Sequence, residues 1–349
     1  MSWHLAARSI HLSDPRNTRR ALRRRPSALG LSLLIPLLAL CVVPPARSGA
    51  ADPRSFAKIY RELREAAPQS PFGLPLSIRS SEEGDRVAAE VRAILEHPFE
   101  TVRASLDEGA ALCEFLPLVE TVKACTVQPM PPDPLLTLFI GRKHYQEPHE
   151  ATAQPYRLAL RTAEPGRMAI HLSAKKGLYG TTAHRFQLEA SAVEGRTVID
   201  LSTSYTQGAA AKLATAVYLA TLGRHKIGFS REATGPDGPP QPVKGIRGMV
   251  ERSVMRHHLA LHAFLDTRPL PPPHRFETCL QTFYALLERY PLQLHDLERE
   301  EYLSAKRRER ENSLRLQAGA DPPRRPPAGP VAETTTAPRG FSAGPWGGP

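Results

Sequence analysis

Residues 86–125 read RVAAEVRAILEHPFETVRASLDEGAALCEFLPLVETVKAC. The first ten residues of this stretch alternate small apolar side chains with more polar ones, which is the two-residue period of a β-strand. The letters HPF then open a helix, because proline is favoured in the first helical turn. A second helical piece is predicted to run to about Leu116, and Pro117 ends it. The segment Leu118–Val127 is predicted to be the next strand.

Five more strands are predicted downstream of this stretch. Their side chains alternate between apolar and polar, and Glu164-Pro165-Gly166 and Glu194-Gly195 mark turns between them. Regular alternation means that one face of the sheet is covered and the other is exposed to solvent, which favours antiparallel pairing. The five strands are Leu135–Lys143, Pro155–Thr162, Arg167–Ala174, Tyr179–Ala190 and Arg196–Gln207.

The pattern becomes helical after Gly208. Apolar residues at helical spacing predict helices over Ala209–Leu222, Gly248–Thr267, Arg275–Tyr290 and Gln293–Gln317. The last of these is dense in both signs of charge, so it is interpreted as a solvated face or as an arm lying over the domain. A further amphipathic helix is predicted near the N-terminus, at residues 55–67.

This order of elements resembles the START-like superfamily, also called SRPBCC. The resemblance is carried by residues 86–125 and extends through the strands to the helix at Gly248–Thr267. The stretches GRKHYQ, YLATLGRHKIGF and GMVERSVMRHHLALHAFL are also similar to uncharacterised exported bacterial START-like proteins. The resemblance implies an α+β helix-grip fold, in which a curved antiparallel sheet of about seven strands wraps the long helix. The helix at Ala209–Leu222 departs from the minimal pattern, and the C-terminal helices are extra.

The charge of the chain is concentrated at its N-terminus. The 349 residues have a net charge of +11, of which residues 1–50 contribute +7 through eight Arg and one Asp. The rest of the chain is therefore only weakly basic, and no nucleic-acid partner is expected. A hydrophobic content of 41% also excludes a protein with many membrane spans.

Residues 1–50 have the layout of a secretory signal peptide. An Arg-rich segment precedes the apolar run Ala28–Val43, and Ser48-Gly49-Ala50 supplies small residues for cleavage before Ala51. We therefore expect an exported, periplasmic protein; an uncleaved inner-membrane anchor is the alternative. The expected organisation is a signal peptide (1–50), an N-terminal helix and loop (51–84), a START-like domain (85–267), a helical C-terminal extension (268–318) and a disordered Pro/Gly-rich tail (319–349).

The cysteines fit an oxidising compartment. Cys113 and Cys125 are candidates for a disulfide across a short loop, which leaves Cys279 unpaired. Three buried thiols are the alternative interpretation. No CxxC or Cys/His finger spacing occurs, so no structural zinc is expected.

A helix-grip fold encloses a cavity between the sheet and the long helix. Its lining is predicted to be mostly apolar with a few polar groups, which is typical of a small-ligand site. The same side chains would equally well fill a solid core. The candidate ligand-binding residues are Tyr156, Leu158, Thr182, His184, Phe186, Leu201, Thr203 and Tyr205.

We expect from this a non-enzymatic protein that binds or carries a hydrophobic, lipid-like ligand in the cell envelope, without a cofactor. One alternative is a cyclase- or aromatase-type enzyme that uses His184 as a general base in the same cavity. Another is a structural or partner-binding envelope protein with a filled core.

Histidines and basic residues offer two weaker sites. His258 and His262 lie four apart on the predicted long helix, beside His257, but the Glu of an HExxH motif is missing. They are therefore interpreted as a surface row, and no metal site is expected. The apolar segment Ala209–Leu222 precedes the basic run 224–226, which leaves open peripheral contact with an anionic membrane or plain core packing.

Overall fold

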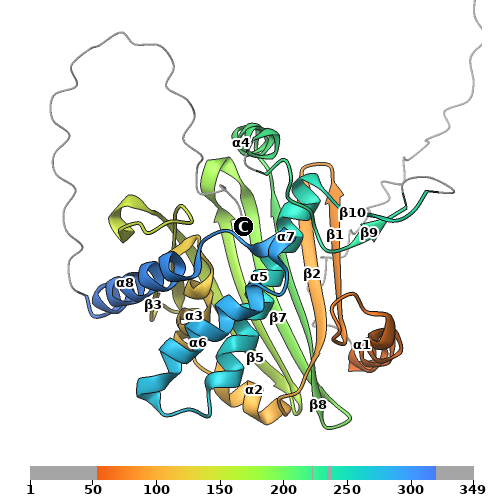
Figure 1. Ribbon diagram of the computed structural model, residues 1–349. Helices are drawn as coiled ribbons and strands as arrows, with labels where there is room; N and C mark the ends of the chain where they lie inside the picture. The colour runs from red at the N-terminus through yellow and green to blue at the C-terminus, as the bar shows by residue number, and fades with distance from the viewer. Residues whose placement is uncertain (1–52, 222, 234–237, 320–349) are drawn as a thin grey trace, which may run out of the picture. The chain divides into compact units, whose positions relative to one another are not determined.

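The computed structural model describes residues 53–221, 223–233 and 238–319. The expected signal segment and nearly all of the expected tail lie outside these residues. The described residues contain one large antiparallel sheet with the strand order β1-β2-β8-β7-β6-β5-β4-β3 (Figure 1). Its strands are β1 (Leu76–Glu83), β2 (Arg86–Leu95), β3 (Val122–Gln128), β4 (Leu135–Ile140), β5 (Thr152–Glu164), β6 (Arg167–Lys176), β7 (Thr182–Val193) and β8 (Arg196–Thr206).

The long helix α5 (Gly245–Thr267) packs on β1, β2 and β8, so the sheet grips it as expected (Figure 1). The helix-grip fold is therefore confirmed, and α5 begins three residues earlier than predicted. Two short helices, α2 (Phe99–Leu106) and α3 (Gly109–Phe115), link β2 to β3. The helix α4 (Ala209–Ala220) and the small β9–β10 hairpin (Arg231–Glu232 and Gln241–Pro242) come between β8 and α5.

The sheet has eight strands rather than about seven, because residues 76–83 form a strand and not the expected loop. Leu76 and Ile78 are buried, but the second half of β1 is mostly exposed, so its alternation is weak. The turn to β2 is Gly84-Asp85, where Gly84 has φ +59°. Glycine adopts this left-handed conformation without steric cost, as a two-residue hairpin turn requires.

The other face of the sheet is covered by α1 (Pro53–Ala66). Phe56, Ile59, Tyr60 and Leu63 form its buried side, as the sequence pattern predicted. They pack against Val198 of β8. Apolar side chains are therefore buried on both faces of this part of the sheet.

The C-terminal helices cover the outer side of α5 and one edge of the sheet. They are α6 (Pro272–Leu287), the short α7 (Pro291–Leu294) and α8 (Arg299–Gln317). The single helix predicted over residues 293–317 is thus wrong, because the chain leaves helical geometry at His295. None of the described helices is long and apolar enough to span a bilayer.

Helix α8 lies along β3, the edge strand of the sheet (Figure 1). Ser313 accepts a hydrogen bond from the Cys125 N–H and donates one to the Cys125 carbonyl, at 3.0 and 2.9 Å. One turn on, Gln317 makes the same pair of bonds with the backbone of Val127, at 2.7 and 3.0 Å. These two side chains take the place of a neighbouring strand and satisfy the outward backbone groups of Cys125 and Val127.

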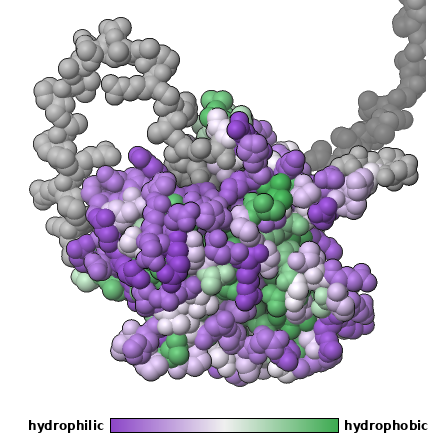
Figure 2. Space-filling view, in the orientation of Figure 1, coloured by the Kyte–Doolittle hydropathy of each residue, from purple (hydrophilic) through white to green (hydrophobic). Residues whose placement is uncertain are grey.

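The outer face of α8 is hydrophilic, but its inner face is buried (Figure 2). Lys306 and Glu309 lie on that inner face, 3% and 2% exposed, although both read as surface residues in the sequence. Glu309 accepts hydrogen bonds from Lys123 of β3 at 2.9 Å and from Lys306 at 2.7 Å. Of the two interpretations of this helix, the arm lying over the domain is therefore confirmed. Buried ion pairs anchor the helix there.

Candidate functional site

A small cavity lies between the sheet and α5, which we call the grip cavity. Its volume is about 140 Å³. Strands β3 to β8 supply one wall, α5 a second, and the turn at 116–121 the third. Its lining residues are Leu116, Val119, Thr121, Val122, Leu138, Ile140, Tyr156, Leu172, Leu178, His184, Arg185, Phe186, Thr203, Tyr205, Met249, Val250, Ser253 and His257.

Five of the eight candidate residues line the grip cavity: Tyr156, His184, Phe186, Thr203 and Tyr205. Leu158 and Leu201 are buried in the hydrophobic core and are not part of its lining. Thr182 is exposed, because a register shift lies between Thr182 and Arg185 and Ala183 has φ +52°. This irregularity breaks the two-residue period that placed Thr182 on the same face as His184.

His184 presents a hydrogen-bond acceptor on the sheet side of the cavity. Thr181 donates its hydroxyl to the Leu178 carbonyl at 2.7 Å, so the Thr181 oxygen accepts from Nε2 of His184 at 2.7 Å. Because a neutral imidazole carries one N–H, Nδ1 holds the lone pair. Burial lowers the pKa of His184 to about 4, so the ring is neutral near pH 7.

Two aromatic neighbours hold the His184 ring in place. The ring stacks on Tyr205, with centroids 5.4 Å apart and planes 14° apart. Tyr156 meets it edge to face at 6.4 Å. Burial raises the pKa of both tyrosines, so they remain neutral phenols. A Cβ at Gly177 would collide with Nε2 of His184, which explains glycine at this position.

His257 supplies a second acceptor from α5. Its Nδ1 donates to the Ser253 carbonyl at 2.8 Å, which leaves the lone pair on Nε2. Its ring meets Phe186 edge to face at 5.4 Å. Burial lowers the pKa of His257 to about 4. Two neutral imidazoles, whose acceptor atoms follow from their hydrogen bonds, thus line one small, mostly apolar cavity.

The interpretation of His257 and His258 as a surface row is wrong. The outer side of α5 is covered by α6, and His258 is 2% exposed. His262 instead pairs with Asp266 at 2.9 Å. Across the ranges that the structure describes, no group of three His, Cys, Asp or Glu side chains is placed to hold a metal ion.

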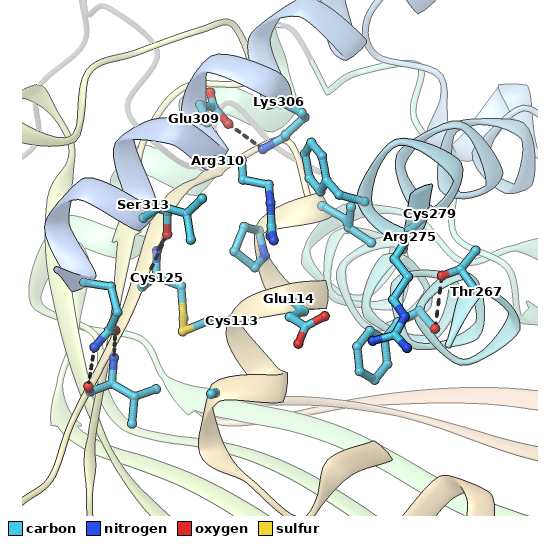
Figure 3. Close-up of a pocket in the computed structure, with 18 of the residues that line it drawn as sticks. Cys113, Glu114, Cys125, Thr267, Arg275, Cys279, Lys306, Glu309, Arg310 and Ser313 are labelled. Atoms are coloured by element: carbon cyan, nitrogen blue, oxygen red, sulfur yellow. Dashed lines mark hydrogen bonds and ion pairs between the residues drawn. A yellow bond between two sulfur atoms is a disulfide. The ribbon is translucent and has the colours of Figure 1, made fainter. Parts of the chain in front are cut away.

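A second and larger cavity lies outside the grip, between α3, β3, α6 and α8 (Figure 3). We call it the C-terminal pocket; its volume is about 630 Å³. Cys113 and Cys125 form a disulfide in its wall, and the thiol of Cys279 lines its other side. Sequence reasoning missed this pocket, because its walls come from several elements that are far apart in the chain, α5 included.

Lys226, from the basic run 224–226, and Lys143, which follows β4, share one structural partner. Lys143 pairs with Asp296 at 2.6 Å, and Lys226 pairs with the same carboxylate at 3.1 Å. Helix α4 leaves Leu213 and Val217 exposed, 59% and 37%. Neither lysine is part of the lining of the grip cavity.

Comparisons with known proteins give similarity at the level of the fold. The sequence matches no family model and no curated protein. Among solved structures, a STAR-related lipid transfer protein fragment from Xanthomonas axonopodis matches with 8% identity, covering 55% of this chain and 98% of that one, at a TM-score of 0.31. A conserved protein of unknown function from Enterococcus faecalis matches with 8% identity, 66% and 98% coverage, and a TM-score of 0.30. Norcoclaurine synthase from Thalictrum flavum matches with 12% identity, 41% and 76% coverage, and a TM-score of 0.27.

Proposed function

We propose that this protein binds a small hydrophobic molecule in the grip cavity, one with an apolar body and a hydroxyl or similar donor. The observation that carries the proposal is the pair of neutral imidazoles, His184 and His257, each with a lone pair in a mostly apolar cavity. An apolar body gains about 25 cal/mol for each Å² that leaves water. A donor group on the ligand would satisfy an acceptor that is otherwise costly to bury.

The size of the cavity restricts the ligand class. Sites for drug-sized ligands usually have about 300–1,000 Å³, and the grip cavity has about 140 Å³. A single ring with a short substituent suits this volume better than a lipid with two acyl chains. We place the function in the cell envelope on the ground of the Arg-rich and apolar segment at residues 1–50.

Binding is favoured over acid–base catalysis for a physical reason. A general base works best when its pKa is close to the working pH. The pKa of His184 is about 4, so its imidazole is a weak base at neutral pH. The side chain is suited to accept a hydrogen bond rather than to remove a proton.

The test is a matched pair of ligands, 4-ethylphenol and ethylbenzene, titrated into the full chain by calorimetry. We expect 4-ethylphenol to bind about fivefold more tightly, since a net hydrogen bond contributes roughly 1 kcal/mol. His184→Phe should remove this preference. The matched control is His171→Phe, because His171 belongs to neighbouring strand β6 and is not part of the cavity lining.

A cavity-filling variant locates the site. Phe186→Trp should abolish binding of both ligands, because Phe186 lines the cavity and contacts the His257 ring. The proposal is wrong if neither ligand binds the unaltered chain, or if the two bind equally. It is also wrong if His171→Phe reduces the preference as much as His184→Phe does.

A further inference from the structure

We propose that the C-terminal pocket is a second ligand site, which takes a single-chain amphiphile with an anionic head, such as a long-chain carboxylate. This site is separate from the grip cavity and does not depend on the function proposed for it. Its volume of about 630 Å³ is within the range of known ligand sites. The apolar walls of the pocket and the guanidinium groups in its lining support this assignment.

The walls of the pocket suit a hydrocarbon chain. They are formed by the Cys113–Cys125 disulfide, Val127, Pro134, Phe264, Phe276 and Leu314. Leu314, a large apolar side chain of this wall, is 56% exposed. A bound chain would cover apolar surface that now faces water, and this burial would favour binding.

The charges of the pocket leave two cations in excess. Its lining holds four cations and two carboxylates: Lys306 pairs with Glu309 at 2.7 Å, and Arg268 pairs with Glu114 at 3.5 Å. Glu309 also pairs with the buried Lys123, at 2.9 Å. Arg275 donates its Nε–H to the Leu270 carbonyl at 2.6 Å. Within the described part of the chain, no carboxylate lies at ion-pair distance from Arg275 or from the remaining arginine, Arg310.

Arg310 is held in a position to receive an anion. Its guanidinium lies over the Phe276 ring, 4.5 Å from the centroid. This contact helps to orient the guanidinium, whose N–H groups can bind a carboxylate with two hydrogen bonds. Figure 3 shows Arg310 from α8 and Arg275 from α6 among the side chains that line the pocket, with Glu114 of α3 also drawn there. Both guanidinium groups therefore belong to the pocket wall, where either can bind an anionic head group.

The pocket is preformed, because α8 cannot move away without breaking strong contacts. Ser313 and Gln317 bind the backbone of β3, and Lys306 donates to the carbonyls of Val119 and Val122 at 2.8 and 2.9 Å. A preformed site loses little conformational entropy on binding. An amphiphile can thus enter a pocket whose walls and charges are already in place.

The experiment compares three C12 amphiphiles with different heads: dodecanoate, dodecanol and dodecyltrimethylammonium. Each is titrated into the full chain by calorimetry, below the concentration at which it forms micelles. We expect dodecanoate to bind at least tenfold more tightly than dodecanol, and the cation not to bind. Raising NaCl from 50 to 500 mM should weaken dodecanoate binding and leave dodecanol binding unchanged, because salt screens the head-group attraction.

The double variant R275Q/R310Q should lower dodecanoate affinity to that of dodecanol. The matched control is R299Q, which removes the same charge from an exposed position of α8. Equal affinity for the three amphiphiles, or an equal loss in R299Q, would overturn the proposal. If the double variant does not fold, the salt comparison on the unaltered chain decides. Loss of dodecanoate binding in F186W would place the ligand in the grip cavity and also refute the second site.

Discussion

Glu309 is the only carboxylate that holds two buried lysines, Lys123 and Lys306, within the residues described. Its two oxygens accept from the two ammonium groups at 2.9 and 2.7 Å, and the three side chains are between 0% and 3% exposed. In Glu309→Gln, one oxygen becomes an NH₂ group that faces an ammonium, donor against donor. The variant also leaves two buried cations uncompensated. Breaking a buried ion pair from one side costs about 3–5 kcal/mol, so we expect the free energy of unfolding to fall by that amount.

The assay is urea unfolding at pH 7, with Glu311→Gln as the matched control. Glu311 is exposed on the same helix, so its substitution should change the free energy of unfolding by less than about 0.5 kcal/mol. A loss below about 1 kcal/mol in Glu309→Gln would show that the buried cluster does not anchor α8.

The pH dependence of the variant gives a second check. Burial, together with the charge of Lys306, lowers the pKa of Lys123 to about 8, and Glu309 opposes this shift. Without Glu309, the pKa of Lys123 should fall further. A lysine with a lowered pKa in the folded state binds fewer protons there than in the unfolded chain, so stability rises with pH once the pH passes the folded-state pKa. The stability gap between variant and wild type should therefore narrow between pH 7 and pH 9; a constant gap would refute this reasoning.

Three further changes test the cavity and the walls around it. Gly177→Ala should displace His184 and remove the preference for 4-ethylphenol over ethylbenzene in calorimetry, because its Cβ would collide with the ring; an unchanged preference would contradict this. The pKa values of His184 and His257, about 4, lie below the unfolded value of 6.5. The unfolded chain therefore binds more protons than the folded chain. In urea unfolding, the free energy of unfolding should fall as the pH drops from 6.5 toward 4, by up to about 1.4 kcal/mol per pH unit for each histidine. A flat pH profile would count against the burial of these two histidines. Replacing Cys113 and Cys125, separated by 12 positions, with Ala should cost roughly 3 kcal/mol and make unfolding insensitive to reductant; a variant as stable as the oxidised wild type would show that the disulfide adds nothing.

Most of the sheet was predictable because the sequences of most of its strands alternate with a two-residue period. In β8, Ile199 and Leu201 are buried while Asp200 between them is only partly so, as the alternation indicates. The first strand was missed because only Leu76 and Ile78 carry that signal. The Gly84-Asp85 turn was the remaining clue, since Gly-Asp between two strands is typical of a hairpin.

The candidate site was only partly predictable, because a sequence period describes ideal geometry. The register shift beside Thr182 is a local departure that no alternation rule anticipates. The burial of His257 and Lys306 depends on which elements cover a helix, and their sequence neighbours do not contain that information. Charged residues at helical spacing indicate a solvent-exposed helix face, although buried ion-pair partners from β3 can compensate such charges.

The two cavities share a wall, and this arrangement explains why the C-terminal helices matter to both. The turn after α3 places Leu116 and Val119 in the grip cavity and Leu118 in the C-terminal pocket. Tyr302 of α8 donates to the Leu118 carbonyl at 2.8 Å, so α8 fixes this thin wall directly. Helix α5 carries Arg256, which is 0% exposed. The guanidinium of Arg256 pairs with Glu120 and with Asp296, which lies just before α8. A buried arginine on the outer side of the gripped helix is stable only when it is covered and paired. The residues after 267 therefore complete the helix grip, and the pocket they form lies next to the cavity that they stabilise.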